Sequence, residues 1–156
     1  FQPGGMEHCS GSCGIMTDKR PGIAVIDGQG GGMGRALVEQ IRREYPGVLI
    51  RALGTNAIAT AAMMKAGAHD GATLILNAGK MDILIGPIGI AMANGLLGEV
   101  TPAMAAAVMA SNAVKIFLPP QKKCEFHFAN GDSQSLQSYI EEAMRILRAE
   151  LAEQLR

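Results

Sequence analysis

A glycine-rich segment at residues 27–34, DGQGGGMG, is the part of this chain best suited to bind a ligand. It stands between a short apolar run, Ile23–Ile26, and a segment with helical periodicity. Glycine lets the backbone approach a phosphate closely, and the following helix N-terminus offers N–H groups and a partial positive charge. We expect phosphate or nucleotide binding here, although a tight turn in a packed α/β sheet would use the same residues. The expected ligand-binding residues of this turn are Asp27, Gly28, Gln29, Gly30, Gly31, Gly32 and Gly34.

Two further loops are expected to reach the same site. Thr55 and Asn56 follow the predicted strand 48–53, and Gly86 and Pro87 lie at the end of the predicted strand that starts at Asp82. Parallel strands deliver the loops that follow them to one edge of the sheet, so these residues should converge on the glycine turn. Thr55 and Asn56 would contact a ribose or its phosphate, and Gly86 and Pro87 would form a wall of the cleft.

Two carboxylates, those of Asp27 and Glu99, are considered for functional roles. Asp27 is the candidate catalytic residue if the protein is an enzyme, which the sequence leaves open. Glu99 is the one charged residue between Ile83 and Val114. It is either a buried acid with a raised pKa or a carboxylate favourably placed at the start of the helix that follows; we favour the second. His69, beside Asp70, is expected to make a loop contact and not to act as a general base.

The cysteines and a histidine suggest a metal site only weakly. Cys9 and Cys13 lie in a polar N-terminal segment, and Cys124 and His127 lie near the end of the predicted sheet. These four residues could close a zinc site, or thiolates could hold an iron–sulfur cluster. The spacing of the first pair is not the usual two-residue knuckle, so we favour free thiols in a disordered arm and a buried Cys124, with no metal.

The glycine turn resembles the nucleotide turn of short-chain dehydrogenases/reductases, in the spacing of Gly28, Gly32 and Gly34 and in the helix that follows. This resemblance implies a nucleotide cofactor, for which NADP is one candidate. The catalytic Tyr-x-x-x-Lys pattern is missing, since neither Tyr45 nor Tyr139 has a lysine four residues later. No Asp or Glu follows the second predicted strand to bind an adenosine ribose, which weakens the case for NAD in particular.

Residues 22–128 as a whole are more similar to a small bacterial family of unknown function. The segments that carry this resemblance are 23–32, 52–57, 82–88 and 98–102. The resemblance implies a Rossmann-like fold and no established activity.

The composition restricts the class of protein. The chain has 156 residues, of which 48% are hydrophobic and 18% charged, with a formal net charge of zero. A disordered chain and a strongly basic nucleic-acid binder are therefore not expected. The longest uncharged run near the middle, residues 83–98, contains Pro87 and four glycines and is too short to span a bilayer, so no membrane segment is expected. Three cysteines fit a cytoplasmic protein.

The apolar pattern predicts one three-layer α/β domain with a mostly parallel, Rossmann-like sheet over residues 22–156. Residues 1–21 are expected to be a cloning remnant, up to Gly5, and a flexible arm without a signal peptide. The expected strands lie at 23–26, 48–53, near His69, at 82–86 and at 114–118, with an edge strand at 124–128. The expected helices lie at 33–45, 57–66, 73–80 and 101–111, within 87–97, and from a cap at Asp132 or Ser133 to the C-terminus.

The helices are rich in methionine, which offers more apolar surface than one sheet of this size should cover. We expect a homo-oligomer, most simply a twofold dimer. The alternative to a ligand-binding protein is thus a non-enzymatic oligomeric scaffold or regulatory protein that keeps the fold without a ligand and whose glycine cleft is empty or filled by side chains.

Overall fold

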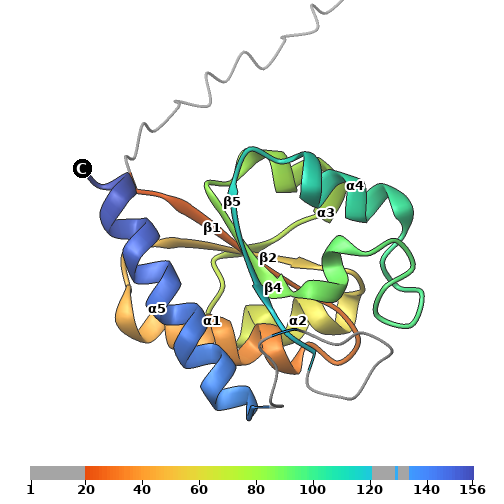
Figure 1. Ribbon diagram of the computed structural model, residues 1–156, viewed down its shortest axis with the longest axis horizontal. Helices are drawn as coiled ribbons and strands as arrows, with labels where there is room; N and C mark the ends of the chain where they lie inside the picture. Colours follow the sequence, from red (N-terminus) through yellow and green to blue (C-terminus); the bar gives the residue numbers. More distant parts are fainter. Residues whose placement is uncertain (1–19, 121–128, 130–133) are drawn as a thin grey trace, which may run out of the picture.

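A five-stranded, entirely parallel sheet forms the centre of the molecule (Figure 1). The computed structural model describes residues 20–120, 129 and 134–156. Its strands are β1 (Gly22–Asp27), β2 (Leu49–Gly54), β3 (Asp70–Gly71), β4 (Ile83–Pro87) and β5 (Val114–Leu118), in the order β3-β2-β1-β4-β5. The predicted α/β fold with a parallel sheet is confirmed.

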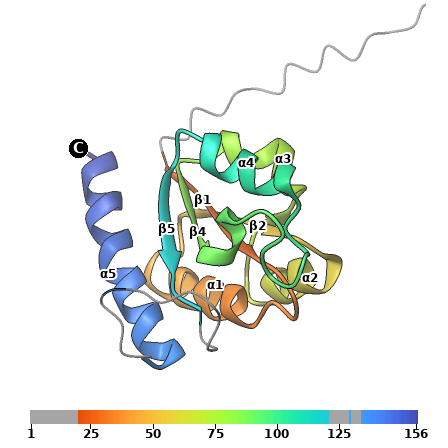
Figure 2. The ribbon, with the colours of Figure 1, turned by 45° about the vertical axis from the view of Figure 1, so that its right-hand side comes forward.

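Helices cover both faces of the sheet. On one face lie α1 (Gly32–Glu44), α2 (Ala57–Lys65) and α5 (Leu136–Gln154). On the other face lie α3 (Leu74–Asn77), α4 (Pro102–Ala110) and two short 3-10 helices, η1 (Ala78–Lys80) and η2 (Ile88–Ala91). Figure 2 shows the sheet between α1 and α2 on one side and α3 and α4 on the other.

The central strand β1 explains why the sequence folds this way. All six of its residues are buried, and β2 and β4 pair with it on either side. Ile23 and Val25 belong to the core under α1 and α5, whereas Ala24 and Ile26 belong to the core under α3 and α4. A strand covered on both faces must be apolar throughout, as this one is until Asp27.

The register brings the carboxyl ends of the strands to one edge. Asp27 at the end of β1 lies opposite Gly54 at the end of β2, and Pro87 at the end of β4 lies opposite Leu118. The chain leaves β1 for α1 on one face and leaves β4 for η2 on the other. The gap between the ends of β1 and β4 is therefore the topological switch point at which open α/β sheets bind their ligands.

Local helix signals were predicted with mixed success. Thr101 caps α4 as predicted, accepting a hydrogen bond from the Met104 N–H at 3.2 Å, with Pro102 at the first helical position. The prediction of Asp132 or Ser133 as the cap of the last helix is wrong, because Ser135 accepts the Ser138 N–H there and the helix begins at Leu136. Ser133 and Ser135 are both suited to cap a helix, and the sequence pattern did not show which of the two does so.

The predicted edge strand at 124–128 lies outside the described residues. No helix within the described ranges is both long and apolar enough to cross a membrane.

Candidate functional site at the carboxyl edge of the sheet

The glycines of the turn after β1 fall into two groups. Gly28, Gly31 and Gly34 are buried, and a Cβ on any of them would lie less than 3 Å from neighbouring atoms. A Cβ on Gly34 would lie 2.7 Å from both the Asp27 Cβ and the Met63 Sδ, and Gly31 has a φ of 72°. Gly31 and Gly34 are required by close packing between β1, α1 and α2, and Gly31 also by its left-handed backbone. Gly28 is required by the close approach of the side chains of Thr55, Leu96 and Glu99.

Gly30 and Gly32 form the second group. Both are exposed, neither has a φ in the left-handed region, and a Cβ on either would meet no atom of the described residues within 4 Å. Among the described residues, no hydrogen bond uses the backbone N–H of Gly30 or Gly32. Packing within the part of the chain that the structure describes therefore explains neither glycine. They leave bare backbone at the first residue of α1, beside the switch point.

Asp27 organises the turn from below. Its side chain is buried, and its two carboxylate oxygens accept hydrogen bonds from the Gly28 N–H at 2.8 Å and the Gly34 N–H at 2.6 Å. Burial raises the pKa of Asp27, the charge of Glu99 adds to this rise, and the backbone N–H groups oppose it. The backbone N–H groups thus offset part of the cost of burying this carboxylate.

Glu99 is the site residue whose role the sequence did not predict. Its Oε2 atom accepts three hydrogen bonds: from the Gln29 N–H at 2.7 Å, the Thr55 hydroxyl at 2.7 Å and the Asn56 side-chain amide at 2.9 Å. These bonds lower the pKa of Glu99, that from Gln29 most. The alternative of a raised pKa is therefore wrong. The Glu99 carboxylate makes its hydrogen bonds to the glycine turn and the end of β2, and the side chain that caps α4 is that of Thr101.

An unusual loop carries Glu99 to this position. Between η2 and α4, Asn94, Leu96 and Leu97 all have left-handed backbone, followed by Gly98 with a φ of 88°. The loop is closed by hydrogen bonds from the Asn94 N–H to the Val100 carbonyl at 2.7 Å and from the Val100 N–H to the Gly95 carbonyl at 3.1 Å. Left-handed backbone at leucine is costly and hard to foresee from sequence.

The remaining predicted site residues lie at the ends of β2 and β4. Thr55 and Asn56 do meet the turn: the Thr55 N–H donates to the Asp27 carbonyl at 2.9 Å, and the Asn56 amide donates to the Gln29 carbonyl at 3.0 Å. Gly86 and Pro87 are buried at the end of β4. Gly86 is explained by packing, since a Cβ there would collide with the Ile26 carbonyl oxygen of β1.

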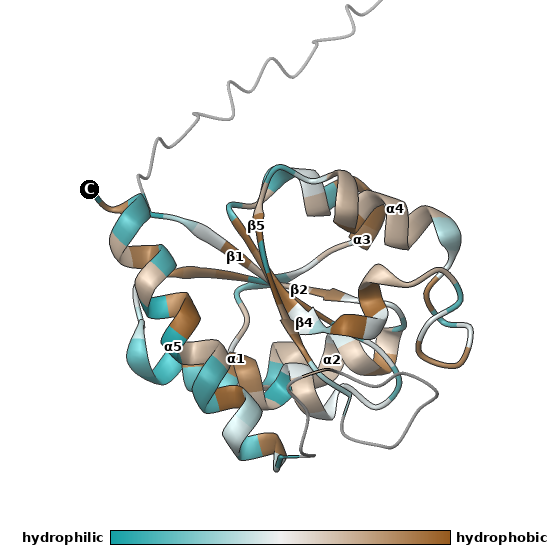
Figure 3. Ribbon diagram, in the orientation of Figure 1, coloured by the Kyte–Doolittle hydropathy of each residue, from teal (hydrophilic) through white to brown (hydrophobic). Residues whose placement is uncertain are grey.

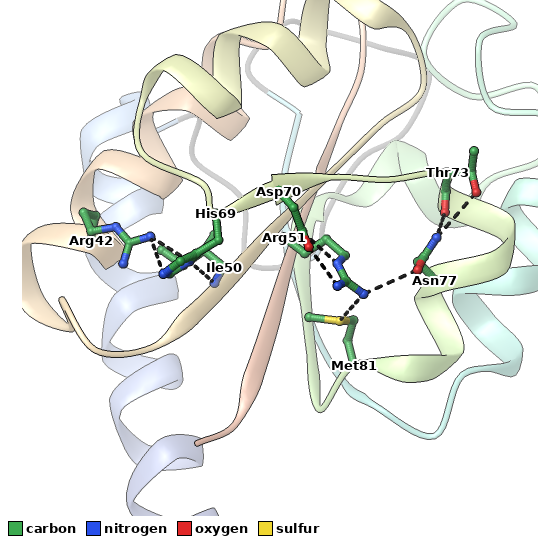
Figure 4. Close-up of polar contacts among 8 residues, drawn as sticks. All are labelled: Arg42, Ile50, Arg51, His69, Asp70, Thr73, Asn77 and Met81. Carbon is green, nitrogen blue, oxygen red and sulfur yellow. Dashed lines mark hydrogen bonds and ion pairs between the residues drawn. The ribbon is translucent and has the colours of Figure 1, made fainter. Parts of the chain in front are cut away.

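A second polar cluster lies at the β2–β3 edge and is structural (Figure 4). The His69 Nδ1 accepts the Ile50 N–H at 3.0 Å and lies 2.8 Å from an Arg42 guanidinium nitrogen. Arg51 makes two hydrogen bonds to the Asp70 carboxylate, at 2.8 and 2.9 Å. His69 makes the kind of loop contact that was expected of it.

The four candidate metal ligands, Cys9, Cys13, Cys124 and His127, lie outside the described residues. Within the described part of the chain, no group of three or more His, Cys, Asp or Glu side chains is arranged to hold a metal ion.

Comparison with known proteins places the chain in a family. The model of a family described as Domain of unknown function (DUF3842) matches residues 22–152. The chain belongs to this family. The resemblance seen in the sequence to a family of unknown function is thereby confirmed, and the DUF3842 match spans every strand described above as well as the Glu99 loop.

Searches beyond the family add little. No curated protein matches the chain. Among solved structures, the crystal structure of AibC is similar with a TM-score of 0.45 and 15% sequence identity. The match covers 88% of this chain and 43% of the AibC chain, so the DUF3842 protein spans less than half the length of AibC. A likeness of this degree carries no conclusion about activity.

Proposed function

We propose that this DUF3842 protein binds a small phosphate-bearing ligand of the nucleotide class at the turn between β1 and α1. The observation that carries the proposal is the pair Gly30 and Gly32, whose backbone is exposed and for which packing against the described residues gives no reason to lack side chains. The oxygens of a phosphate there would accept hydrogen bonds from the N–H groups at the start of α1. The partial positive charge at this end of the helix dipole would also favour the phosphate.

The rest of the edge supports a ligand at this position. The turn lies at the switch point between β1 and β4, and Thr55 and Asn56 border it from the end of β2. Asp27 has both oxygens engaged by backbone N–H groups, so we assign it the role of holding the turn in shape. The proposal is therefore one of binding and assigns no reaction.

The experiment is a thermal-shift and calorimetric screen of ATP, ADP, NAD, NADP and inorganic phosphate against wild type and Gly32→Val. Gly79→Val is the matched control, because Gly79 is also exposed and a Cβ added there would meet nothing within 4 Å, but it lies in η1 on the opposite face. We expect at least one compound to stabilise wild type and the control, and to bind Gly32→Val at least tenfold more weakly in Kd. Equal binding to all three proteins would refute the site, and binding of none of the compounds would refute the ligand class.

A second candidate function, an oligomeric scaffold, is favoured by the surface of α4. The exposed residues of this helix are proline, alanine and methionine only, and Met109 is 53% exposed. Figure 3 shows α4 in the tan and brown of apolar residues along most of its length. On the neighbouring α3, Leu76 is 69% exposed. A helix that is apolar all round is normally covered, and we propose a second copy of the chain as its cover.

Light scattering after size exclusion tests the scaffold proposal. We expect a dimer for wild type at micromolar concentration and a monomer for Met109→Glu. Met64→Glu is the control, since Met64 is 37% exposed on α2, which covers the other face of the sheet. A wild-type monomer, or a dimer unaffected by Met109→Glu, would refute this interface.

A further inference from the structure

Glu99 has one oxygen that is fully engaged and one that is not. Oε2 takes all three donors from Gln29, Thr55 and Asn56. No hydrogen bond to Oε1 is found within the described residues. Three bonds fix the carboxylate in place, so the unengaged oxygen is held in a defined position with an acceptor's capacity left over.

The position of this carboxylate relative to the bare backbone gives it a role. The Gln29 N–H donates to the Glu99 carboxylate, and Gln29 is the residue immediately before Gly30. The Asn56 side-chain amide donates to both the Glu99 carboxylate and the Gln29 carbonyl, so it links Glu99 to the glycine turn. A ligand with a phosphate over Gly30 and Gly32 therefore has its next group within reach of Glu99. This next group must be one that can bind to the ionised carboxylate of Glu99, which contacts Thr55 and Asn56 just after β2.

A carboxylate accepts hydrogen bonds from hydroxyl groups and repels phosphate oxygens. The bonds that Glu99 receives favour its ionised form, so it offers no proton of its own to a phosphate. In a nucleotide, the group joined to the phosphate is the ribose, whose free 2′ and 3′ hydroxyls are donors. A phosphate on the 2′ oxygen would bring two negative groups together in a partly desolvated site.

We infer that Glu99 is a specificity-determining residue, which accepts the hydroxyls of an unphosphorylated ribose and excludes a ribose that carries a 2′-phosphate. This inference rests on the proposed function and narrows it to the class of nucleotides with a free ribose diol. It replaces NADP, the cofactor suggested by the sequence, with NAD or another nucleotide of that class. Glu99 lies 43 residues after Asn56 in the chain. It would provide the acidic side chain for the ribose that is missing at the end of β2.

The test compares NAD with NADP, which differ only in the 2′-phosphate, by calorimetry on the full chain. Glu99→Gln keeps the size and one acceptor of the side chain while removing the charge. Glu142→Gln is the control for the loss of one negative charge, because Glu142 lies on α5 and pairs with Arg145. Circular dichroism and the Tm establish that each variant is folded.

We expect wild type and Glu142→Gln to bind NAD at least tenfold more tightly than NADP. In Glu99→Gln the ratio should fall to about one, because NAD binding weakens and NADP binding gains. If wild type binds both compounds equally and Glu99→Gln changes neither, the specificity role is refuted while nucleotide binding stands. An equal gain for both compounds in Glu99→Gln also refutes it, and shows that Glu99 blocks the site. If ADP binds but neither NAD nor NADP binds any variant, the role of Glu99 in choosing between these two dinucleotides is refuted. If no compound of the screen binds, the proposed function itself is refuted.

Discussion

Three glycine-to-alanine substitutions in one turn should separate packing from function. Gly34→Ala places a Cβ 2.7 Å from the Asp27 Cβ and the Met63 Sδ, so α1 must move away from β1 and α2. Overpacking of this kind costs about 1–3 kcal/mol. Gly31→Ala adds a left-handed alanine, at roughly 1–2 kcal/mol, to a Cβ that would lie 2.8 Å from the Ala59 Cα.

Gly32→Ala should do the opposite. A Cβ there meets no atom within 4 Å in the described part of the chain, the φ is compatible with alanine, and the residue is the first of α1. Alanine reduces the conformational freedom of the unfolded chain, so we expect the free energy of unfolding to rise by about 0.4–1 kcal/mol. The same substitution should weaken ligand binding, because the methyl group covers the N–H groups that the ligand would approach.

Urea denaturation followed by circular dichroism gives the free energy of unfolding for wild type and the three variants. The expected order of stability is Gly32→Ala above wild type, and wild type above both Gly31→Ala and Gly34→Ala. A Gly32→Ala protein less stable than wild type by more than about 0.5 kcal/mol, where surface substitutions normally lie within that limit, would refute the reasoning. It would mean that Gly32 has a structural role, and the case for a ligand would lose its main support.

Three other predictions concern single side chains. Folding raises the pKa of Asp27, so the folded state holds the proton of this carboxyl more tightly than the unfolded state does. The stability due to Asp27 is therefore greatest below its unfolded pKa and falls as pH rises through the folded pKa. In urea titrations, the stability of wild type relative to Asp27→Asn should decline as pH rises above the unfolded pKa of Asp27, and a constant difference would contradict this. Arg51 lowers the pKa of Asp70, so this ion pair stabilises the fold above the unfolded pKa of Asp70 and loses that contribution as pH falls through the folded pKa. Both side chains are partly exposed, which limits the strength of the pair. Asp70→Asn should therefore lower the free energy of unfolding by about 1 kcal/mol or less at neutral pH and leave it unchanged in acid. Thr101→Ala removes the cap of α4 and should lower the free energy of unfolding by about 1 kcal/mol, whereas Thr101→Ser should leave it within a few tenths of wild type.

Much of this fold could be read from local sequence. The apolar run from Ile23 to Ile26 is buried on both faces, as its lack of alternation indicated, and the Thr101-Pro102 pair begins a helix where predicted. These features depend on residues adjacent in the chain, so they are visible without a three-dimensional structure. The convergence of Thr55 and Asn56 on the glycine turn also followed, because parallel strands bring their following loops to one edge.

The role of Glu99 and the division of the glycines were decided only by tertiary structure. Glu99 lies 70 residues from Gln29 in the chain, and a loop with several left-handed residues, for which the sequence holds no clear signal, brings the two together. Residues 30, 31 and 32 are all glycine, yet a Cβ on Gly31 would collide with Ala59 of α2, whereas a Cβ on either neighbour would meet no described atom within 4 Å. Whether a glycine serves packing or a ligand depends on the atoms that surround its missing Cβ, and those atoms come from elements far away in the chain.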